Sequence, residues 1–350
     1  MAYPSTCRSF RRTTGPYPLS IVPATETLPE SLAPHDVLIR MHAVALNYRD
    51  IAMLQEGGYP APVASGGIPA NDCAAEVVAV GDAVQTFAIG DRVAPTVDLA
   101  NLTGNERNND LKATGGNQPG VLTEYSVFQD SVLVKLPRHL SWEEASVIAC
   151  AGVTAWVALG ALKDVRDDTT ALMQGTGGVS MFALLICLAA GIRPIITSSS
   201  DSKLAQLQKL SPKIAVINYK KHSNVAAEAL RLTDGKGVDY VLNVTGTASI
   251  PSDLEMLRKR GGSVALIGFL EGLHADWKPD VLLGFLIKAA KLQGILAGSR
   301  DDFAALNKFL EAKTVHLDSI IDRTFAFEDS VAAFEYLRSG THVGKIVIKF

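Results

Sequence analysis

The chain has 350 residues, of which 47% are hydrophobic and 20% are charged, and its formal net charge is -3. This length and composition predict a globular protein of about two domains. The near-neutral charge, without a basic cluster, argues against a nucleic-acid partner. No apolar run is long enough to span a bilayer, and the first ten residues hold no apolar signal-peptide core, so we expect a cytoplasmic protein with no membrane partner.

The first part of the chain carries short apolar or alternating runs that Gly, Pro and Asp separate. These runs, at Asp36–Ala45, Cys73–Val80 and Arg92–Ala94, predict strands of an antiparallel, barrel-like domain. The segment Asn101–Gly120 is polar and glycine-rich without periodicity, which indicates an exposed loop. The four cysteines are far apart and form no CxxC pair, so the sequence predicts neither a disulfide framework nor a zinc knuckle.

A short apolar run ends at Met173 and leads through Gln174 into a glycine turn that opens an apolar helix. The residues of this turn are Gly175, Thr176, Gly177, Gly178 and Val179. A strand, a tight turn and a helix in this order aim several backbone N–H groups and the positive helix end at one point, where a pyrophosphate can bind. Glycines let the main chain approach the phosphates without a Cβ atom. A purely structural turn is the alternative, because such turns between strand and helix are common.

From Thr169 onward, apolar β-rich runs alternate with helical patterns. The predicted strands are Thr169–Met173, Pro194–Thr197, Ile214–Asn218, Val238–Val244, Ser263–Ile267 and Leu292–Leu296. The predicted helices are Val179–Ala190, Ser202–Leu210, Ser223–Thr233, Ile250–Arg260 and Pro279–Ala289. Strands joined by crossover helices predict an α/β domain with a doubly wound parallel sheet. Two helices, Phe303–Ala312 and Glu328–Ser339, and a last strand, Lys345–Phe350, are expected after it.

The end of the second strand of this sheet bears on the choice of cofactor. NAD-specific sheets carry a carboxylate there, about 20 residues after the glycines, that binds the ribose hydroxyls. Here the strand end carries Ser198 and Ser199, and Lys203 follows on the next helix. Hydroxyl groups and a cation suit a 2′-phosphate, so the sequence favours NADPH over NADH. Asp201 disagrees, but it lies beyond the strand end; for the serines, a helix cap is the alternative role.

Several blocks resemble the medium-chain dehydrogenase/reductase (MDR) superfamily, and specifically its zinc-independent quinone oxidoreductase and enoyl reductase branch. The blocks are Ala45–Ile51, Gly57–Pro60, Glu76–Gly81, Gly90–Val93, Cys150–Trp156, the glycine turn and Gly344–Ile348. The resemblance covers nearly the whole chain. It implies a Rossmann doubly wound parallel sheet plus a GroES-like antiparallel β-barrel domain. The implied domains are a GroES-like catalytic domain at 1–153, a Rossmann NADPH-binding domain at 154–298, and a segment at 299–350 that returns to the catalytic domain. The implied assembly is a homodimer.

The resemblance also indicates where a metal would be held. Alcohol dehydrogenases of the superfamily bind a catalytic zinc with two cysteines and a histidine, and the matching positions here are Asn47, Asn71 and Cys150. A neutral amide is a poor zinc ligand, and one cysteine cannot make the site alone. Residues 93–120 lack the four cysteines of the family's structural zinc. We therefore predict no metal, with Cys150 as a core or cleft residue.

The predicted absence of a metal points to a class of reaction. Negative charge that grows on a substrate oxygen must then be met by hydrogen-bond donors rather than by a Lewis acid. Hydride addition to an enone or enoyl thioester gives a delocalised enolate, which needs only donors and a proton at the α-carbon. The leading prediction is therefore an NADPH-dependent reductase of an activated C=C bond or a quinone. The alternatives are an NADP-dependent alcohol dehydrogenase or carbonyl reductase, and a nucleotide-binding protein of this fold with little catalysis or a redox-neutral role.

The resemblance implies the remaining site residues. Tyr59 matches a tyrosine that enoyl reductases use as a proton donor or orienter, and a phenol stays protonated at neutral pH. An ordinary aromatic residue in a Gly-Pro turn is the alternative. Asn47 and Tyr48 offer donors to the substrate oxygen, or serve the structure alone. Tyr219 matches an NADPH-binding tyrosine of quinone reductases. Further cofactor candidates from the resemblance are Val244, Gly268, Phe269, Leu270, Ser299 and Lys345, with a core role as the alternative for Phe269.

Overall fold

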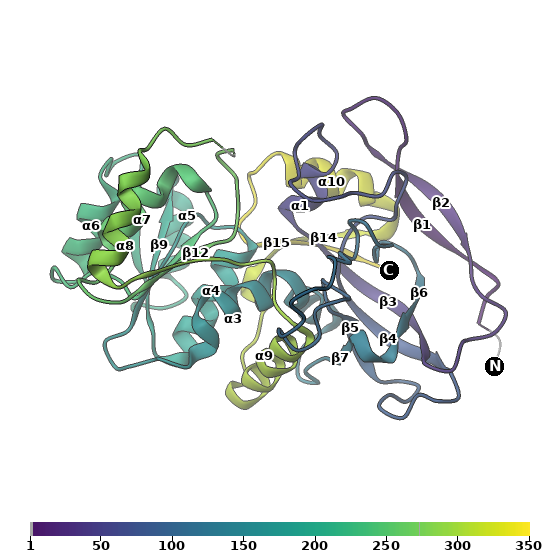
Figure 1. Ribbon diagram of the computed structural model, residues 1–350. Coiled ribbons are helices and arrows are strands. Elements are labelled where there is room, and N and C mark those ends of the chain that lie inside the picture. The colour runs from purple at the N-terminus through teal and green to yellow at the C-terminus, as the bar shows by residue number, and fades with distance from the viewer. Residues whose placement is uncertain (1–2, 273) are drawn as a thin grey trace. The chain divides into compact units, whose positions relative to one another are not determined.

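The computed structural model describes residues 3–272 and 274–350. The chain divides into two compact units, one formed by residues 1–153 and 297–350 and the other by residues 154–296. Each unit has its own sheet and its own buried core (Figure 1). None of the helices in the described part has the length and hydrophobicity that a bilayer crossing requires.

The first unit is built on a mixed, mainly antiparallel sheet with strand order β14-β15-β3-β4-β5-β7, in which β6 also pairs with β3. A separate antiparallel pair is formed by β1 and β2. The strands are β1 (Thr6–Arg12), β2 (Ile21–Thr27), β3 (Asp36–Leu46), β4 (Asp72–Val80), β5 (Arg92–Pro95), β6 (Tyr125–Gln129), β7 (Leu133–Lys135), β14 (Ile321–Ala326) and β15 (Lys345–Lys349). Because β15 pairs antiparallel with the end of β3, the C-terminal strand lies beside the start of α1 (Tyr48–Ala52).

The helices of this unit also include α2 (Trp142–Ala145), α9 (Arg300–Lys313) and α10 (Ser330–Arg338), while α3 (Val153–Ala158) spans the boundary. The predicted strands of this part and its two predicted late helices are confirmed, with small shifts at their ends. The segment Asn101–Gly120 forms a loop with isolated bridges, as predicted. Its expected exposure is wrong for residues 113–116, which are buried because Arg12 and Arg49 bond their carbonyl oxygens.

The second unit holds a six-stranded parallel sheet with order β10-β9-β8-β11-β12-β13. Its strands are β8 (Thr170–Met173), β9 (Arg193–Ser198), β10 (Ala215–Asn218), β11 (Tyr240–Asn243), β12 (Ser263–Leu266) and β13 (Lys291–Gly294). Its helices are α4 (Gly178–Ala190), α5 (Asp201–Gln208), α6 (Val225–Leu232), α7 (Ile250–Met256) and α8 (Leu283–Lys288). The six predicted strands and the doubly wound sheet are confirmed. The helix predicted to end at Arg260 ends at Met256, because Leu257 is already extended.

The central strands of the sheet in the second unit, β8 and β11, are buried along their whole length. The strand order reverses after β10, so right-handed crossovers place α4 and α5 on one face and α6 and α7 on the other. The core under α6 and α7 is lined by Leu172, Ile195, Ile217, Val241, Val264, Ala226, Ala229 and Leu254. The carboxyl ends of the parallel strands share one edge, and β8 and β11 are neighbours at the point of reversal, where ligands bind in folds of this kind.

Candidate functional site

The glycine turn lies at the carboxyl end of β8 and opens α4. Gly175 has a φ of +72°, and a Cβ atom built on Gly175 or Gly177 would meet no atom within 4 Å. Gly177 caps α4 without any side-chain hydrogen bond, so the first N–H groups of this helix have no side-chain acceptor there. Ser180, which stands where the usual turn has its third glycine, is buried and donates to Gln174 O at 2.7 Å. Open space and uncapped donors together fit a phosphate group.

A second group of predicted residues meets at the ends of β9 and β10. The backbone N–H of Tyr219 donates to Ser198 O at 3.1 Å, and half-exposed Tyr219 follows β10 directly. Ser199 is exposed, and Lys203 lies in the first turn of α5, where its backbone N–H donates to Ser200. The serine that caps α5 is therefore Ser200. Ser198 and Ser199, at the end of β9, do not serve as the cap of this helix.

Asp201 is the residue whose negative charge argues against a bound 2′-phosphate. Its carboxylate has partners within this unit. Its Oδ2 pairs with Lys221 Nζ at 2.6 Å, and its Oδ1 accepts from Asn218 Nδ2 at 2.6 Å. These two hydrogen bonds lower the pKa of Asp201. Balanced in this way, the carboxylate opposes a nearby phosphate less than a free one does.

The predicted nicotinamide-side residues also come together, at the ends of β11 and β12. The N–H of Leu270 donates to Val244 O at 3.3 Å, and a Cβ atom on Gly268 would lie 2.4 Å from the same oxygen. Phe269 lies between them in sequence, and its Cα is 3.3 Å from where a Cβ atom on Gly246 would be. Val244 and the 268–270 segment thus form one surface at the carboxyl edge of the sheet.

A buried polar cluster, which sequence reasoning missed, supports this edge. Gln174 Oε1 accepts from the N–H groups of Val244 and Thr245, at 3.2 and 3.3 Å, and from the Thr245 hydroxyl at 2.8 Å. Gln174 Nε2 donates to Asp253 Oδ1 at 2.7 Å. Asp253 Oδ2 accepts from Asn243 Nδ2 at 2.6 Å and from Ser249 Oγ at 3.1 Å. One feature of the sequence could have indicated this cluster: Asp253 lies three residues after Ile250, on the apolar side of a predicted helix.

In the first unit, the three positions that match zinc ligands do lie together. Asn47 Nδ2 donates to Asn71 Oδ1 at 3.3 Å, and Asn71 is one of the groups that influence the pKa of the Cys150 thiol. Asp72 adds a buried carboxylate, whose Oδ1 accepts from the Cys150 N–H at 2.6 Å. Lys345 is buried too, and its ammonium donates to Asp72 Oδ2 at 3.0 Å and to Asn47 Oδ1 at 2.7 Å. The Asn47 amide also donates to Asp72 Oδ2 at 3.0 Å, so its N–H and C=O groups all have partners within the protein.

This donor set does not fit zinc. Zinc prefers thiolate, imidazole or carboxylate, and two of the three matching positions offer neutral amides. The third is a thiol, and burial together with Asp72 raises the pKa of Cys150 to about 11, which disfavours the thiolate that a metal needs. Across residues 3–272 and 274–350, no three His, Cys, Asp or Glu side chains are grouped so that they could hold a metal ion.

The candidate proton donor Tyr59 lies against Arg49. Arg49 Nε donates to the Tyr59 hydroxyl at 3.3 Å, and its guanidinium carbon is 5.4 Å from the Tyr59 ring centroid. Arg49 is buried and donates to Thr114 O at 2.8 Å. A Cβ atom on Gly116 would lie 2.9 Å from Arg49 Nη2, so glycine leaves room for the guanidinium. Tyr59 itself is partly exposed.

Two further predicted residues have roles that the structure shows. Tyr48 begins α1 and is 44% exposed. Ser299 is the N-cap of α9, where its hydroxyl accepts from the Asp302 N–H at 3.1 Å and donates to the Asp302 carboxylate at 2.6 Å. Its hydroxyl is therefore already used within the first unit.

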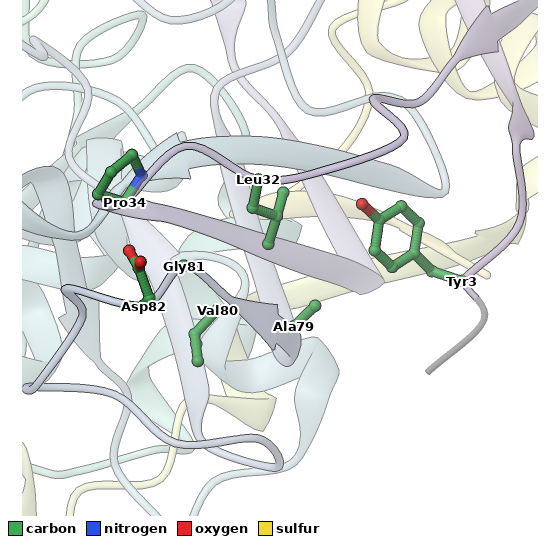
Figure 2. A pocket seen from close by; sticks show the side chains of 7 residues that line it. All are labelled: Tyr3, Leu32, Pro34, Ala79, Val80, Gly81 and Asp82. Atoms are coloured by element: carbon green, nitrogen blue, oxygen red, sulfur yellow. The ribbon is translucent and has the colours of Figure 1, made fainter.

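A shallow hollow of about 400 Å³ elsewhere on the first unit has no comparable chemistry. Figure 2 shows Tyr3 at one end of this hollow and Asp82 and Pro34 at the other, with Leu32 between them. The Tyr3 hydroxyl donates to Pro29 O at 2.8 Å. One carboxylate among apolar side chains offers neither an acid–base pair nor a phosphate-binding site. The candidate site is therefore assigned to the residues around the glycine turn in the second unit and to those around Asn47 and Tyr59 in the first.

Comparisons with known proteins agree with this arrangement. Residues 33–138 match the family model of the alcohol dehydrogenase GroES-like domain, and residues 178–312 match that of the zinc-binding dehydrogenases. A zinc-type alcohol dehydrogenase-like protein of Schizosaccharomyces pombe is 35% identical over 331 residues, which cover 93% of this chain and 94% of that protein. The chain belongs to the medium-chain dehydrogenase/reductase superfamily.

Solved structures of MDR proteins extend the likeness to the fold. A structure from Sinorhizobium meliloti, described as an alcohol dehydrogenase, matches with a TM-score of 0.89 and 32% identity and covers 100% of both chains. A quinone oxidoreductase of Pseudomonas syringae pv. tomato matches with a TM-score of 0.77 and 25% identity over 98% of this chain and 100% of the other. The predicted GroES-like and Rossmann architecture is confirmed, and the protein is an oxidoreductase of the MDR family.

Proposed function

We propose that this MDR protein is a zinc-independent, NADPH-dependent reductase of an activated C=C bond, such as an enone or enoyl thioester, or of a quinone. The observation that carries the proposal is the donor set at the family's zinc position: two amides, a thiol and a buried Lys345–Asp72 ion pair. With such a set, negative charge on a substrate oxygen is best met by hydrogen-bond donors of the protein. Reactions that pass through a delocalised enolate or a quinol anion need the least stabilisation of negative charge on that oxygen.

The residues of the second unit support NADPH as the cofactor. The open turn at Gly175–Val179 receives the pyrophosphate, and Ser198, Ser199, Lys203 and Tyr219 receive the 2′-phosphate and adenosine. Val244, Gly268, Phe269 and Leu270 line the nicotinamide half. When bound, the cofactor supplies a hydride. The 2′-phosphate requires cations and hydroxyls, and the Lys221 and Asn218 contacts of Asp201 partly offset the negative charge that would oppose it.

The residues of the first unit supply the proton and hold the negative charge. The Tyr59 hydroxyl is the proton donor for the α-carbon, and Arg49 orients it by donating to its oxygen. Tyr48, which is exposed and precedes Arg49 in the sequence, offers a donor to the substrate oxygen. Asn47 acts on that oxygen less directly, since its amide is engaged with Lys345, Asp72 and Asn71.

A screen of NADPH oxidation tests the reaction class. The purified protein is given enones, enoyl thioesters, quinones and aldehydes, with and without a metal chelator, and its metal content is measured. We expect turnover of one of the first three classes, unchanged by the chelator. Tyr59→Phe should lower that turnover by a factor of roughly 10² or more, whereas the control Tyr17→Phe, an exposed tyrosine of the same unit, should not. Equal turnover in Tyr59→Phe and the wild type would remove Tyr59 from the mechanism.

A carbonyl reductase or alcohol dehydrogenase is the second candidate, because the relatives from Schizosaccharomyces pombe and Sinorhizobium meliloti carry alcohol dehydrogenase names. The same screen separates the two. Aldehyde reduction, or NADP⁺ reduction by an alcohol, that the chelator abolishes would replace our proposal with a zinc-dependent activity. Tight NADPH binding without turnover of any acceptor would instead indicate a nucleotide-binding protein with little catalysis.

We also propose that the protein is a homodimer formed through β13. This strand is the edge of the parallel sheet, and its four residues are exposed. The helix that precedes it, α8, carries large exposed apolar side chains, with Leu286 at 77% and Ile287 at 76% exposure. An unpaired edge strand flanked by apolar residues can pair antiparallel with a second copy of itself across a two-fold axis.

Light scattering after size-exclusion chromatography tests the dimer. Leu286→Glu with Ile287→Glu should convert the dimer into a monomer, because four charges would meet at the two-fold contact. Ile89→Glu is the matched control, since Ile89 is an exposed apolar residue of the first unit. A monomeric wild type, or a dimer that survives the paired substitution, would rule out this interface.

A further inference from the structure

Two arginines of the first unit are buried and are held by uncharged groups. Arg12 is 2% exposed and Arg49 is 9% exposed. Arg12 donates to three backbone carbonyl oxygens, two of which belong to residues 115–116 and lie at 2.9 and 3.3 Å. Arg49 donates to Thr114 O in the same loop at 2.8 Å and to the Tyr59 hydroxyl at 3.3 Å. One loop therefore holds both guanidinium groups, through oxygen atoms that carry no negative charge.

The buried charges around these arginines do not balance. The carboxylate of Asp50 is completely buried and acts electrostatically on both Arg12 and Arg49. The other buried charges nearby, Lys345 and Asp72, form an ion pair and cancel each other. Two guanidinium groups against one further carboxylate leave one positive charge in excess, and a guanidinium keeps its proton. Because a buried charge without a counter-charge is costly, this region favours the binding of an anion.

One N–H group of Arg49 is ready to bind such an anion. Its Nη2 is buried and has no hydrogen-bond partner among the described residues. Nε and Nη2 form one edge of the planar guanidinium, and such an edge can bind two oxygen atoms side by side. At Nε this edge meets the Tyr59 hydroxyl at 3.3 Å, which is long for an N–H···O hydrogen bond, so the hydroxyl can shift when a ligand arrives.

The exposure of the neighbouring residues indicates the side from which a ligand approaches. Thr114 and Gly116, which contact the other parts of the Arg49 guanidinium, are buried. Tyr59 is partly exposed. A substrate that comes from the side of Tyr59 meets the phenolic hydroxyl and the Nε–Nη2 edge together. The two groups can therefore act on neighbouring atoms of one substrate.

We infer that Arg49 is a catalytic residue, whose Nη2 group donates to the substrate oxygen on which negative charge develops, next to the α-carbon that Tyr59 protonates. The inference rests on the proposed function and narrows its substrate class. An oxygen and an α-carbon in this relation belong to a C=C bond conjugated to a carbonyl group, as in an enone or enoyl thioester, rather than to a quinone.

The step balances with NADPH as the reductant. A hydride adds to the β-carbon, and the electron pair of the C=C bond moves onto the carbonyl oxygen, which becomes an enolate oxygen. The guanidinium of Arg49 offsets this charge without giving up its proton. The Tyr59 proton then joins the α-carbon, the C=O bond forms again, and solvent returns a proton to the phenolate.

The test is a double-mutant cycle on the acceptor that the NADPH-oxidation screen identifies. We expect Arg49→Gln to lower kcat by a factor of roughly 10²–10³, as for the loss of one donor to an oxyanion. In a chain that already carries Tyr59→Phe, the same substitution should lower kcat by about a further factor of ten or more. If it has no further effect there, Arg49 acts only through the Tyr59 phenol and the inference fails. Turnover of quinones alone would also contradict it.

Two further variants separate this role from folding. Arg49→Lys keeps a buried cation that can still donate to Thr114 O, but it lacks the Nε–Nη2 edge. It should lose activity as Arg49→Gln does, with a circular dichroism spectrum like that of the wild type. Arg107→Gln is the matched control, since it removes an exposed arginine of the same unit and should keep the wild-type kcat. An Arg49→Lys variant that is as active as the wild type would overturn the inference.

Calorimetric titration with hexanoate is a readout that needs no turnover. Hexanoate is a stable anion, and its two carboxylate oxygens suit the Nε–Nη2 edge of a guanidinium. We expect it to bind the wild type and Arg107→Gln alike, and to bind Arg49→Gln with a Kd at least about tenfold larger. Equal binding by the wild type and Arg49→Gln, or no binding by either, would contradict the inference. If the wild type reduces no acceptor, the proposed function falls, while this titration still decides whether Arg49 binds an anion.

Discussion

Each unit buries a carboxylate beside its candidate site, and the two carboxylates are held in opposite ways. Asp72 of the first unit faces the buried ammonium of Lys345 at 3.0 Å. Asp253 of the second unit is held by two amides and a hydroxyl, all neutral. An ion pair fixes both of its charges, whereas neutral donors only partly offset the burial of a charge. The first unit thus pairs its buried carboxylate with a cation, and the second holds its buried carboxylate with neutral donors, which leaves the pKa of Asp253 raised to about 7.

The largest expected effect comes from breaking the ion pair. Lys345→Met leaves the Asp72 carboxylate buried without its cation, so the free energy of unfolding should fall by about 3–5 kcal/mol. Urea unfolding followed by circular dichroism measures the loss. In the double variant Lys345→Met with Asp72→Asn, neither charge remains, and most of the stability should return. A single variant as stable as the wild type would show that the ion pair does not hold the first unit together.

The second prediction tests the contrast between Asp72 and Asp253 by measuring how the stability of the protein changes with pH. The folded-state pKa of Asp253 is raised from 3.8 to about 7, so between these values the folded protein binds more protons at this group than the unfolded chain. The contribution is fully present below about pH 4 and is lost as the pH rises through about 7. About three pKa units correspond to at most roughly 4 kcal/mol. Thermal unfolding across this range should therefore show wild-type stability falling relative to Asp253→Asn.

The matched comparison for this pH effect is Asp167→Asn, at an exposed carboxylate of the same unit. Because other carboxylates titrate in both proteins, only the difference between wild type and variant is informative. A difference that stays constant from about pH 4 to about pH 7 would contradict the buried, neutral-donor environment of Asp253.

A third variant separates binding from stability in the second unit. A Cβ atom on Gly177 would meet nothing within 4 Å, and the φ of Gly177 is -78°, which any residue adopts. Gly177→Ala should therefore fold with an unchanged melting temperature while its methyl group occupies the space of the phosphates. We expect about a tenfold larger Kd for NADPH, or about 1.4 kcal/mol. Gly191→Ala, at a φ of +79° in the αL cap of α4, should instead lower stability and leave Kd unchanged.

The centre of the sheet in the second unit could be predicted closely because β8 and β11 are buried along their whole length and belong to apolar runs. The less buried pair β1 and β2 gave no such signal: β2 alternates exposed and partly buried residues and contains Pro23. The strand β7 has only three residues, too few for any periodicity. The predictions thus found all six strands of the parallel sheet, whereas they missed the three-residue strand β7 and the separate pair β1 and β2.

The polar clusters could be predicted only in part. The likeness to the MDR family brought Asn47, Asn71 and Cys150 together correctly, but Lys345 lies 273 residues from Asp72 in sequence, and no local pattern joins them. A lysine at the head of an otherwise apolar strand was the available signal, since a buried lysine needs an acidic partner. The hydrogen bonds of Gln174 depend on how β8 and β11 pair, which the order of strands in the sequence does not specify.

The smallest expected effect tests how far the neutral donors control Asp253. Ser249→Ala removes one hydroxyl that donates to its Oδ2 at 3.1 Å, and this hydrogen bond favours the charged form. Its loss should raise the pKa of Asp253 further and cost about 1 kcal/mol of stability above neutral pH, with less cost below it. The measurement is the pH midpoint of the stability difference from Asp253→Asn, which should move upward. Ser211→Ala, which removes an exposed hydroxyl bonded to the Lys213 N–H, should leave that midpoint in place. If both variants leave it unchanged, the pKa of Asp253 is set by burial alone, and the hydroxyl contributes only packing.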